Sequence, residues 1–120
     1  MTEMQTYTGG CHCGAVRFEA DVAIQTGIAC NCSMCAKRGG LLGFTSSDHF
    51  RLQSGEDSLT EYRFNKRAIA HLFCKTCGVA SFSRGKQPKT GDDVVALNLR
   101  CLDGLDIDSV PVHRVDGAKL

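Results

Sequence analysis

Three closely spaced cysteines carry the strongest chemical signal in this sequence. Cys30, Cys32 and Cys35 form a C-x-C-x-x-C pattern, and Lys37 and Arg38 follow it after Ala36. This spacing lets three sulfurs converge on one metal ion, and it supplies no obvious fourth ligand nearby. Structural zinc is normally closed by four protein ligands, whereas catalytic zinc keeps one coordination position open. The triplet therefore predicts a reactive metal site.

Two cysteine pairs elsewhere in the chain supply a second set of sulfurs. Cys11 and Cys13 form a C-x-C pair, and in an extended segment residues i and i+2 point to the same face. Cys74 and Cys77 form a C-x-x-C pair followed by Gly78, which can adopt the positive φ that such a turn tends to need. Together the pairs predict a closed structural zinc site that joins the N-terminal strand to the middle of the chain.

Other uses of the cysteines are also considered. A reducing compartment disfavours disulfides, which argues against a disulfide framework for the eight cysteines. A thioredoxin-like redox pair at Cys74 and Cys77 is disfavoured because no helical pattern follows it. A different partition closes the triplet with Cys101 or a histidine such as His71, which would make both sites structural. That partition stays open.

The remaining histidines give weaker signals. His12 alternates with Cys11 and Cys13, so it should point away from their ion. His49 and His113 are expected to be ordinary surface or packed residues.

Length and charge narrow the class of protein. The 120 residues fit a single zinc-binding domain over 1–120. With 14 Lys and Arg against 13 Asp and Glu, the net charge of +1 gives no basic field for nucleic acid. No apolar run reaches the ~18 residues of a membrane helix, and residues 1–6 lack the features of a signal peptide. We therefore expect a cytoplasmic protein with no nucleic-acid or membrane partner.

The elements that must position these cysteines are mostly short strands. Alternating or β-prone segments bounded by turn residues predict a mainly β domain, with Ser33–Lys37 as a single helical turn ended by Gly39. Residues 54–57 predict a hairpin or tight corner, and residues 85–93 predict a surface loop. The run 94–99 should be central in its sheet. The expected strands are 5–7, 15–20, 41–44, 50–52, 58–64, 68–73, 79–83, 94–99 and 110–115.

The cysteine motifs resemble those of a known family. The motifs are Gly9-Gly10-Cys11-His12-Cys13-Gly14, Cys30-Asn31-Cys32-Ser33-Met34-Cys35 and Phe73-Cys74-Lys75-Thr76-Cys77-Gly78. Their order and spacing are similar to the glutathione-dependent formaldehyde-activating enzyme and centromere protein V family. The resemblance implies a β-tent of short antiparallel sheets stapled by zinc, with one structural zinc and a second zinc on the triplet. It also implies carbon–sulfur lyase chemistry that forms S-hydroxymethylglutathione, although residues 59–79 look closer to the centromere protein V branch, where the role is binding.

Three functional hypotheses follow from these residues. In the first, a small thiol such as glutathione completes the triplet zinc and adds to formaldehyde or a related aldehyde, with Lys37 or Arg38 pairing with a carboxylate of glutathione. No residue stands out as a general base. The second is a non-catalytic zinc-stapled module that binds a protein partner. The third is redox or metal sensing by the exposed triplet.

Overall fold

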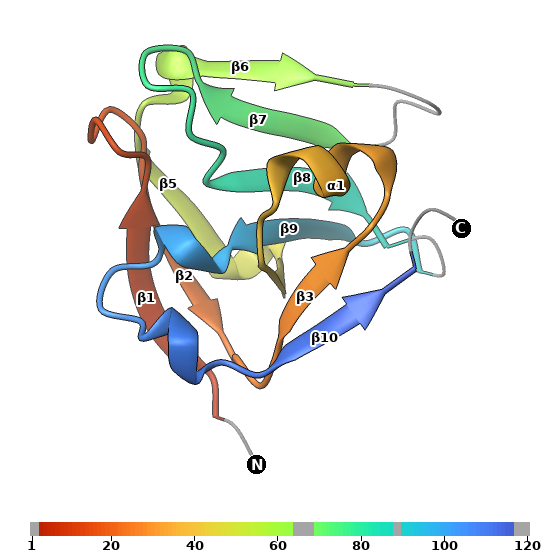
Figure 1. Cartoon of the computed structure of the whole chain (residues 1–120). Helices are drawn as coiled ribbons and strands as arrows, with labels where there is room; N and C mark the ends of the chain where they lie inside the picture. Colours follow the sequence, from red (N-terminus) through yellow and green to blue (C-terminus); the bar gives the residue numbers. More distant parts are fainter. Residues whose placement is uncertain (1–2, 64–68, 88–89, 117–120) are drawn as a thin grey trace.

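The protein is described by a computed structural model that covers residues 3–63, 69–87 and 90–116. It contains two sheets and one short α-helix, α1 (Ser33–Arg38), which confirms the predicted mainly β fold (Figure 1). The smaller sheet has the order β1-β2-β5, with β1 (Gln5–Gly10), β2 (Arg17–Val22) and β5 (Phe50–Ser54). The larger sheet has the order β10-β3-β4-β9-β8-β7-β6. Its strands are β3 (Gly27–Cys30), β4 (Leu42–Ser46), β6 (Leu59–Tyr62), β7 (Ala70–Cys74), β8 (Phe82–Lys86), β9 (Asp93–Asn98) and β10 (Val112–Val115).

Period-two patterns in the sequence explain the strands that carry the core. Along β2, buried and half-buried residues alternate without a break, as expected for a strand with one face in the core. In β9, Val95 and Leu97 are fully buried, and this strand lies between β4 and β8. The prediction that this run is central in its sheet is confirmed.

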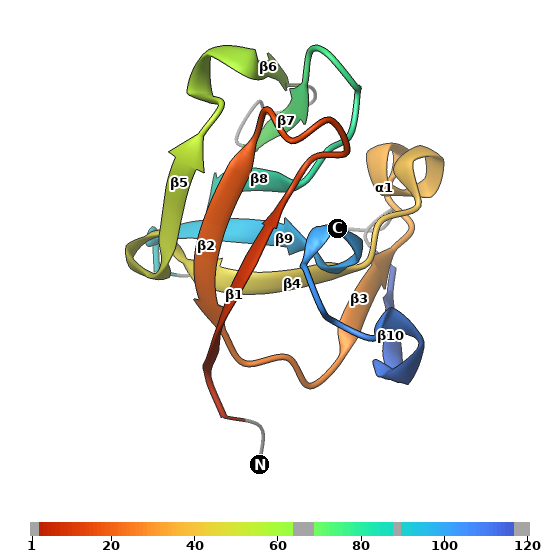
Figure 2. The ribbon, with the colours of Figure 1, turned by 90° about the vertical axis from the view of Figure 1, so that its left-hand side faces the viewer.

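Three phenylalanines join the two sheets. Phe18 and Phe50 come from the smaller sheet and Phe82 comes from the larger one. Their ring centroids lie 4.6 to 5.9 Å apart with tilted or edge-on geometry, which is favourable for aromatic pairs. Figure 2 shows the smaller sheet crossing in front of β4, β8 and β9. The core is therefore the layer between the two sheets.

Residues 54–57, predicted to form either a hairpin or a tight corner, lie where the chain passes from one sheet to the other. β5 and β6 belong to different sheets, and between them lie Gly55, with φ of 89°, and the 3₁₀ helix η2 (Glu56–Ser58). The Ser58 N–H donates a hydrogen bond of 2.9 Å to the Gly55 carbonyl. This segment is thus a tight corner. The other 3₁₀ helices are η1 (Ser47–His49), η3 (Leu99–Cys101) and η4 (Ile107–Ser109).

Some element boundaries differ from the prediction. β8 begins at Phe82 rather than at residue 79, because the Val79 carbonyl accepts a hydrogen bond from the Cys74 N–H in the cysteine turn. The strand then continues to Lys86, so the predicted loop begins after that residue. The predicted strand 58–64 begins one residue later, at Leu59, because Ser58 belongs to η2. The last residue of that prediction and the first residue of the predicted strand 68–73 lie outside the described residues.

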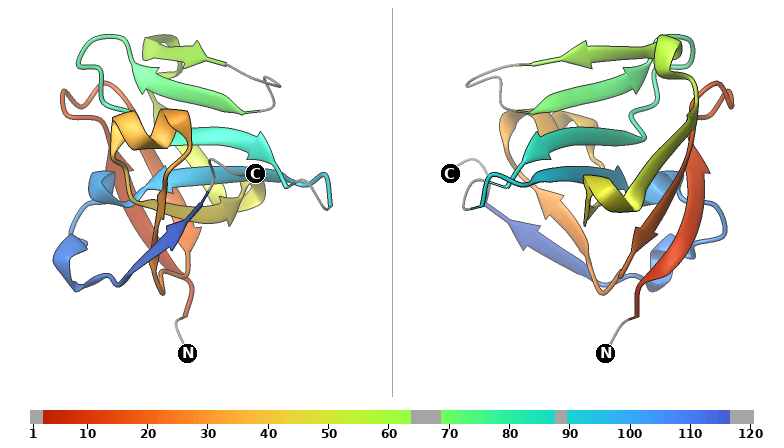
Figure 3. Two further views of the ribbon diagram at one scale, coloured as in Figure 1. Left: turned by 45° about the vertical axis from the view of Figure 1, so that its right-hand side comes forward. Right: turned by 180° about the vertical axis from the view of Figure 1, so that it is seen from behind.

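The pairing of the large sheet is antiparallel except at one edge. β10 pairs with β3 in parallel, while β3 meets β4 at the single register pair Ile28 and Leu42. Figure 3 shows β3 and β10 side by side and diverging from the other strands. Among the described residues, no helix is long and apolar enough to cross a membrane.

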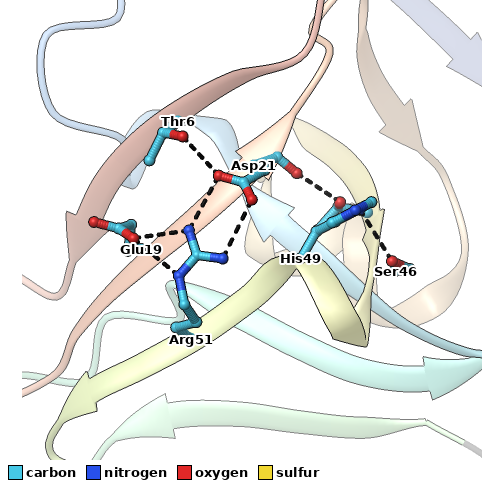
Figure 4. A network of polar contacts seen from close by, with 7 residues as sticks. Thr6, Glu19, Asp21, Ser46, His49 and Arg51 are labelled. Atoms are coloured by element: carbon cyan, nitrogen blue, oxygen red, sulfur yellow. Dashed lines mark hydrogen bonds and ion pairs between the residues drawn. The ribbon is translucent and has the colours of Figure 1, made fainter.

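A polar network holds the outer face of the small sheet (Figure 4). Arg51 on β5 donates hydrogen bonds to Glu19 at 2.9 Å and to Asp21 at 3.0 Å, both on β2. Thr6 on β1 donates to Asp21 at 2.6 Å, so one carboxylate links all three strands. These hydrogen bonds from Arg51 and Thr6 lower the pKa of Asp21 to about 2.

Candidate metal centres and the adjoining groove

Four cysteines from the two sheets meet in one cluster, which we call the four-cysteine cluster. Its members are Cys11, Cys13, Cys74 and Cys77, and their sulfur atoms all lie within 4.8 Å of one another. The first pair lies in the turn between β1 and β2, closed by a hydrogen bond of 3.1 Å from the Cys11 N–H to the Val16 carbonyl. This turn replaces the extended segment predicted there, but both sulfurs still reach one point.

The second pair lies in the turn that follows β7. The Gly78 N–H donates a hydrogen bond of 2.8 Å to the Cys74 carbonyl, and Gly78 has φ of 80°. A side chain at this φ would strain the backbone, so glycine suits the turn. Cys74 is fully buried, while Cys77 is half-buried.

The spacing of these sulfurs fits a tetrahedral ion. The Cys13 Sγ lies 3.6 Å from the Cys11 Sγ and 3.7 Å from the Cys74 Sγ. Four sulfurs placed about 2.3 Å from one zinc ion at the corners of a tetrahedron lie roughly 3.8 Å from one another. Because the observed separations are close to that value and far above a disulfide bond of about 2.0 Å, the cluster could hold a metal ion.

The electrostatics of this cluster favour the thiolate form at Cys74 and Cys77 but not at Cys13. Backbone hydrogen bonds from Cys13 and Val79 lower the pKa of Cys77 to about 6. Backbone hydrogen bonds from Cys77 and Thr76 likewise lower the pKa of Cys74 against partial desolvation. For Cys13, a backbone hydrogen bond from Ala15 lowers the pKa, but desolvation and the neighbouring thiols raise it to about 11. The group shares its protons unequally, as closely spaced thiols do.

The second group, the three-cysteine cluster, forms where β3 runs into α1. The sulfurs of Cys30, Cys32 and Cys35 lie within 4.8 Å of one another, and all three residues are half-buried. Cys30 ends β3, Cys32 caps α1, and Cys35 lies in its first turn. The helix continues to Arg38 and ends at Gly39, with φ of 72°, so the predicted helical turn is confirmed.

Backbone N–H groups point at two sulfurs of the three-cysteine cluster. The Cys32 N–H donates to the Cys30 Sγ at 3.4 Å, and the Cys35 N–H donates to the Cys32 Sγ at 3.4 Å. Burial raises the pKa of Cys32, but backbone hydrogen bonds from Cys35 and Met34 and side-chain hydrogen bonds with Cys35 and Cys30 outweigh it, so the net pKa is lowered. For Cys35, burial and the neighbouring thiols raise the pKa to about 12. The cluster is thus built to stabilise negative charge first on Cys32.

An apolar groove of about 720 Å³ opens beside the three-cysteine cluster. Phe44 and Ala96 line it from β4 and β9, whereas the neighbouring Thr45, Val95 and Leu97 are buried on the other side of the sheet. The groove therefore lies on the face of the large sheet opposite the small sheet, with α1 in front of this face (Figures 1 and 3). The apolar residues that line it include Ile28, Leu42, Phe44, Ile69, Ala96 and Val115.

The two cations predicted to bind substrate take different positions. Arg38 is exposed overall but lines the groove, where partial desolvation lowers its pKa while the charge of Cys35 raises it. Lys37 is exposed and does not line the groove. His71 on β7 lines the groove as well, and burial followed by the charge of Arg38 lowers its pKa. The groove thus brings Arg38 and His71 to the side of the three cysteines.

The structure also places the residues considered as a fourth ligand. Neither the Cys101 sulfur nor a ring nitrogen of His71 lies within 4.8 Å of all three sulfurs of the three-cysteine cluster. Cys101 lies nearer the other cluster: burial raises its pKa to about 11, and the charges of Cys11 and Cys77 add to that increase. A triplet closed by Cys101 therefore does not agree with this geometry.

The other histidines lie outside both clusters. His12 and His113 are exposed, and His49 shares a hydrogen bond of 3.2 Å with Ser46. What the sequence reasoning missed is the set of groove residues, among them Phe44, Ile69 and Asn98, because they come from strands far apart in the chain and carry no local motif.

Comparison with known proteins agrees with this arrangement. Residues 6–113 match the model of the family described as glutathione-dependent formaldehyde-activating enzyme. The structure is also similar to the crystal structure of a Rhodobacter sphaeroides protein, with a TM-score of 0.76 and 30% sequence identity, covering 88% of this chain and 99% of that chain. This chain therefore belongs to the glutathione-dependent formaldehyde-activating enzyme family.

Proposed function

We propose that this protein is a zinc-dependent carbon–sulfur lyase of the S-hydroxymethylglutathione synthase type. In this proposal the four-cysteine cluster holds a structural zinc ion, and the three-cysteine cluster holds a second zinc ion that is open to a small thiol. Glutathione is the proposed thiol, and formaldehyde or a related aldehyde is the proposed electrophile. Membership of the family supports a formaldehyde-activating function, and the site geometry supports the assignment of the chemistry to the triplet.

One observation carries the proposal. Among the described residues, the group at Cys30, Cys32 and Cys35 contains no fourth cysteine, histidine or carboxylate within its span, and the same three residues line the groove. A closed structural site would have four protein ligands and no opening toward a pocket. The three-cysteine cluster has the arrangement expected for an ion that takes a ligand from outside the protein.

The donor set favours a thiol over water as that ligand. Zn²⁺ supplies an acidic centre that lowers the pKa of a bound thiol, and three soft thiolates favour another sulfur donor. Three thiolates also give the site a net negative charge, which makes water activation less favourable than at a neutral three-histidine site. The reaction forms one carbon–sulfur bond, moves the carbonyl π pair to oxygen, and returns to that oxygen the proton that the thiol gave up.

Two side chains in the groove are assigned roles in this reaction. Arg38 pairs with a carboxylate of glutathione, because charge-assisted hydrogen bonds to guanidinium are strong and directional. Burial and Arg38 keep His71 uncharged at neutral pH by lowering its pKa, so its imidazole can take up the thiol proton and return it to the new hydroxyl. Lys37 lies outside the groove and contributes only a positive charge near the site.

Cobalt substitution tests the proposal directly. We would replace zinc with Co²⁺ and titrate glutathione while recording the thiolate-to-cobalt charge-transfer and d–d absorption bands. A saturable spectral change at one of the two metals is expected. No change up to millimolar glutathione would favour the non-catalytic zinc module instead.

Matched serine variants assign the change to one site. Cys32→Ser should abolish it, whereas Cys101→Ser should leave it intact because Cys101 belongs to neither cluster. Full metal content and unaltered thiol binding in Cys32→Ser would contradict the proposal.

A further inference from the structure

We propose that the groove beside the three-cysteine cluster binds the apolar substituent of an aldehyde larger than formaldehyde, so that the preferred electrophile is an aliphatic or aromatic aldehyde. This inference rests on the proposed function, because it names the class of electrophile used at the same site. It concerns the chain's own residues in the groove, and it is tested below by a binding measurement that needs neither thiol nor turnover.

The size of the groove is the first argument. Its volume of about 720 Å³ falls within the ~300–1,000 Å³ range of pockets that enclose whole small-molecule ligands. Formaldehyde has one carbon and one oxygen and no substituent that could contact the walls. Formaldehyde by itself could not cover the apolar walls of a groove that extends from the three-cysteine cluster to Phe44 and Val115.

The chemistry of the walls is the second argument. Two large side chains of the groove, Phe44 and Ile69, are 53% and 47% exposed, although neither projects into the core. Leaving such side chains in water is unfavourable, and clustered exposed apolar residues mark a place where a ligand or partner binds. An apolar substituent that covers them would bind through the hydrophobic effect.

The distribution of charge separates the thiol from the aldehyde. Glutathione carries two carboxylates and an ammonium group, so it requires charged or strongly polar neighbours. Among the described residues that line the groove, Arg38 is the cation, and no carboxylate lines it. Arg38 and Cys35 both belong to α1, so the charged groups of glutathione find their partner at the α1 end of the groove, beside the three-cysteine cluster. The apolar remainder is then left for the second substrate.

The chemistry of the larger aldehyde balances in the same way as that of formaldehyde. The sulfur of the thiol forms a bond to the carbonyl carbon, and the π pair moves to the oxygen. That oxygen takes up one proton and the thiol gives up one, so the product is a hemithioacetal with no oxidant or reductant consumed. The substituent on the carbonyl carbon is unchanged and stays in the groove.

The test uses unreactive probes first. Straight-chain alcohols of increasing length, from methanol through butanol to hexanol, are titrated into the metal-loaded protein by isothermal calorimetry. Each added methylene that enters the groove should tighten binding roughly fourfold until the groove is filled. In the presence of glutathione, kcat/KM should rise with chain length from butanal to hexanal. Affinity and kcat/KM that do not depend on chain length would overturn the inference.

Two exposed apolar residues of similar exposure provide variant and control. Phe44→Ser removes a groove wall, whereas Val112→Ser removes a side chain that is 48% exposed and does not line the groove. Hexanol binding should weaken by roughly three- to tenfold in the first variant and stay unchanged in the second. Ile69→Ser gives an independent measurement if Phe44→Ser folds poorly.

These readouts separate the two proposals. Loss of the glutathione response in cobalt protein with intact hexanol binding would contradict the thiol function and leave the groove assignment standing. Loss of hexanol binding with an intact glutathione response would overturn only the proposed class of aldehyde. If analytical ultracentrifugation shows a dimer that Phe44→Ser dissociates, the groove is an interface between copies of the chain, and the aldehyde inference is wrong.

Discussion

The Sγ atoms of Cys13 and Cys74 lie 3.7 Å apart, although 61 positions separate the two residues in the chain. Cys13 belongs to the turn of the small sheet, and Cys74 ends β7 of the large sheet. A metal ion held between them would therefore cross-link the two sheets. The three phenylalanines Phe18, Phe50 and Phe82 join the same sheets through apolar contact.

Removing one sulfur of the four-cysteine cluster should unfold the protein. Metal binding to such sites contributes on the order of 10 kcal/mol, which is comparable with the ~5–15 kcal/mol net stability of a domain. We expect Cys74→Ser to lose one metal ion per chain and its cooperative melting transition, measured by metal analysis and circular dichroism. Cys101→Ser is the control and should keep both metal ions. A folded Cys74→Ser protein would show that the cluster is dispensable.

The aromatic contact between the sheets should also be essential for stability. Phe50 is 7% exposed, with its ring 4.6 Å from that of Phe82. Phe50→Ala should lower the free energy of unfolding by about 3–5 kcal/mol, because it removes a buried ring and leaves a cavity. Chemical denaturation measures this loss. Phe44→Ala, at an exposed position of the other face, should cost far less.

The small sheet should show a defined pH dependence through Asp21. Its pKa is lowered to about 2 from an ordinary value of 3.8, with Arg51 as the largest cause. The stabilisation is therefore fully present above about pH 4 and is lost as the pH falls through about 2. In wild-type protein the carboxyl ¹³C signal of Asp21 should stay at its ionised position between pH 7 and pH 4. In Arg51→Met it should begin to titrate in that range; identical titrations in both proteins would contradict this account.

Glutathione binding should distinguish the two adjacent cations. Arg38 lines the groove, whereas Lys37 does not. Arg38→Gln should weaken glutathione binding by roughly two- to fivefold, the range expected for a partly solvated ion pair. Lys37→Gln should change it by less than that. Cobalt absorption measures both affinities, and equal effects would show that only the overall charge of α1 matters.

His71 should affect turnover more than binding. We expect His71→Gln to lower kcat for formation of the thiol adduct by roughly tenfold or more, with little change in KM, because it removes proton transfer rather than a binding contact. His49→Gln is the matched control, since His49 contacts Ser46 away from the groove. The rate of adduct formation over a range of pH provides the measurement. An unchanged pH profile in His71→Gln would rule out this role.

The sequence alone predicted the grouping of seven cysteines into one triplet and two pairs, but it left open whether Cys101 or a histidine closes the triplet. Ligands that are two or three residues apart must lie close together whatever the rest of the chain does, so C-x-C and C-x-x-C spacing predicts where the sulfurs meet. Two other predictions also depended only on neighbouring residues. The helical turn before Gly39 followed from its capping residues, and the central position of the run 94–99 followed from its β propensity.

Only the tertiary structure decided what surrounds those sulfurs. The groove is assembled from residues of six strands, and alternation along a strand does not say which face meets the core and which stays open. The same limit applies to Cys101, which approaches the four-cysteine cluster because of how η3 packs, and to β10, whose parallel pairing with β3 depends on a long connection. Chemistry that depends on adjacent residues could be read from the sequence, whereas the position of the substrate groove required the packing of strands that are distant in the chain.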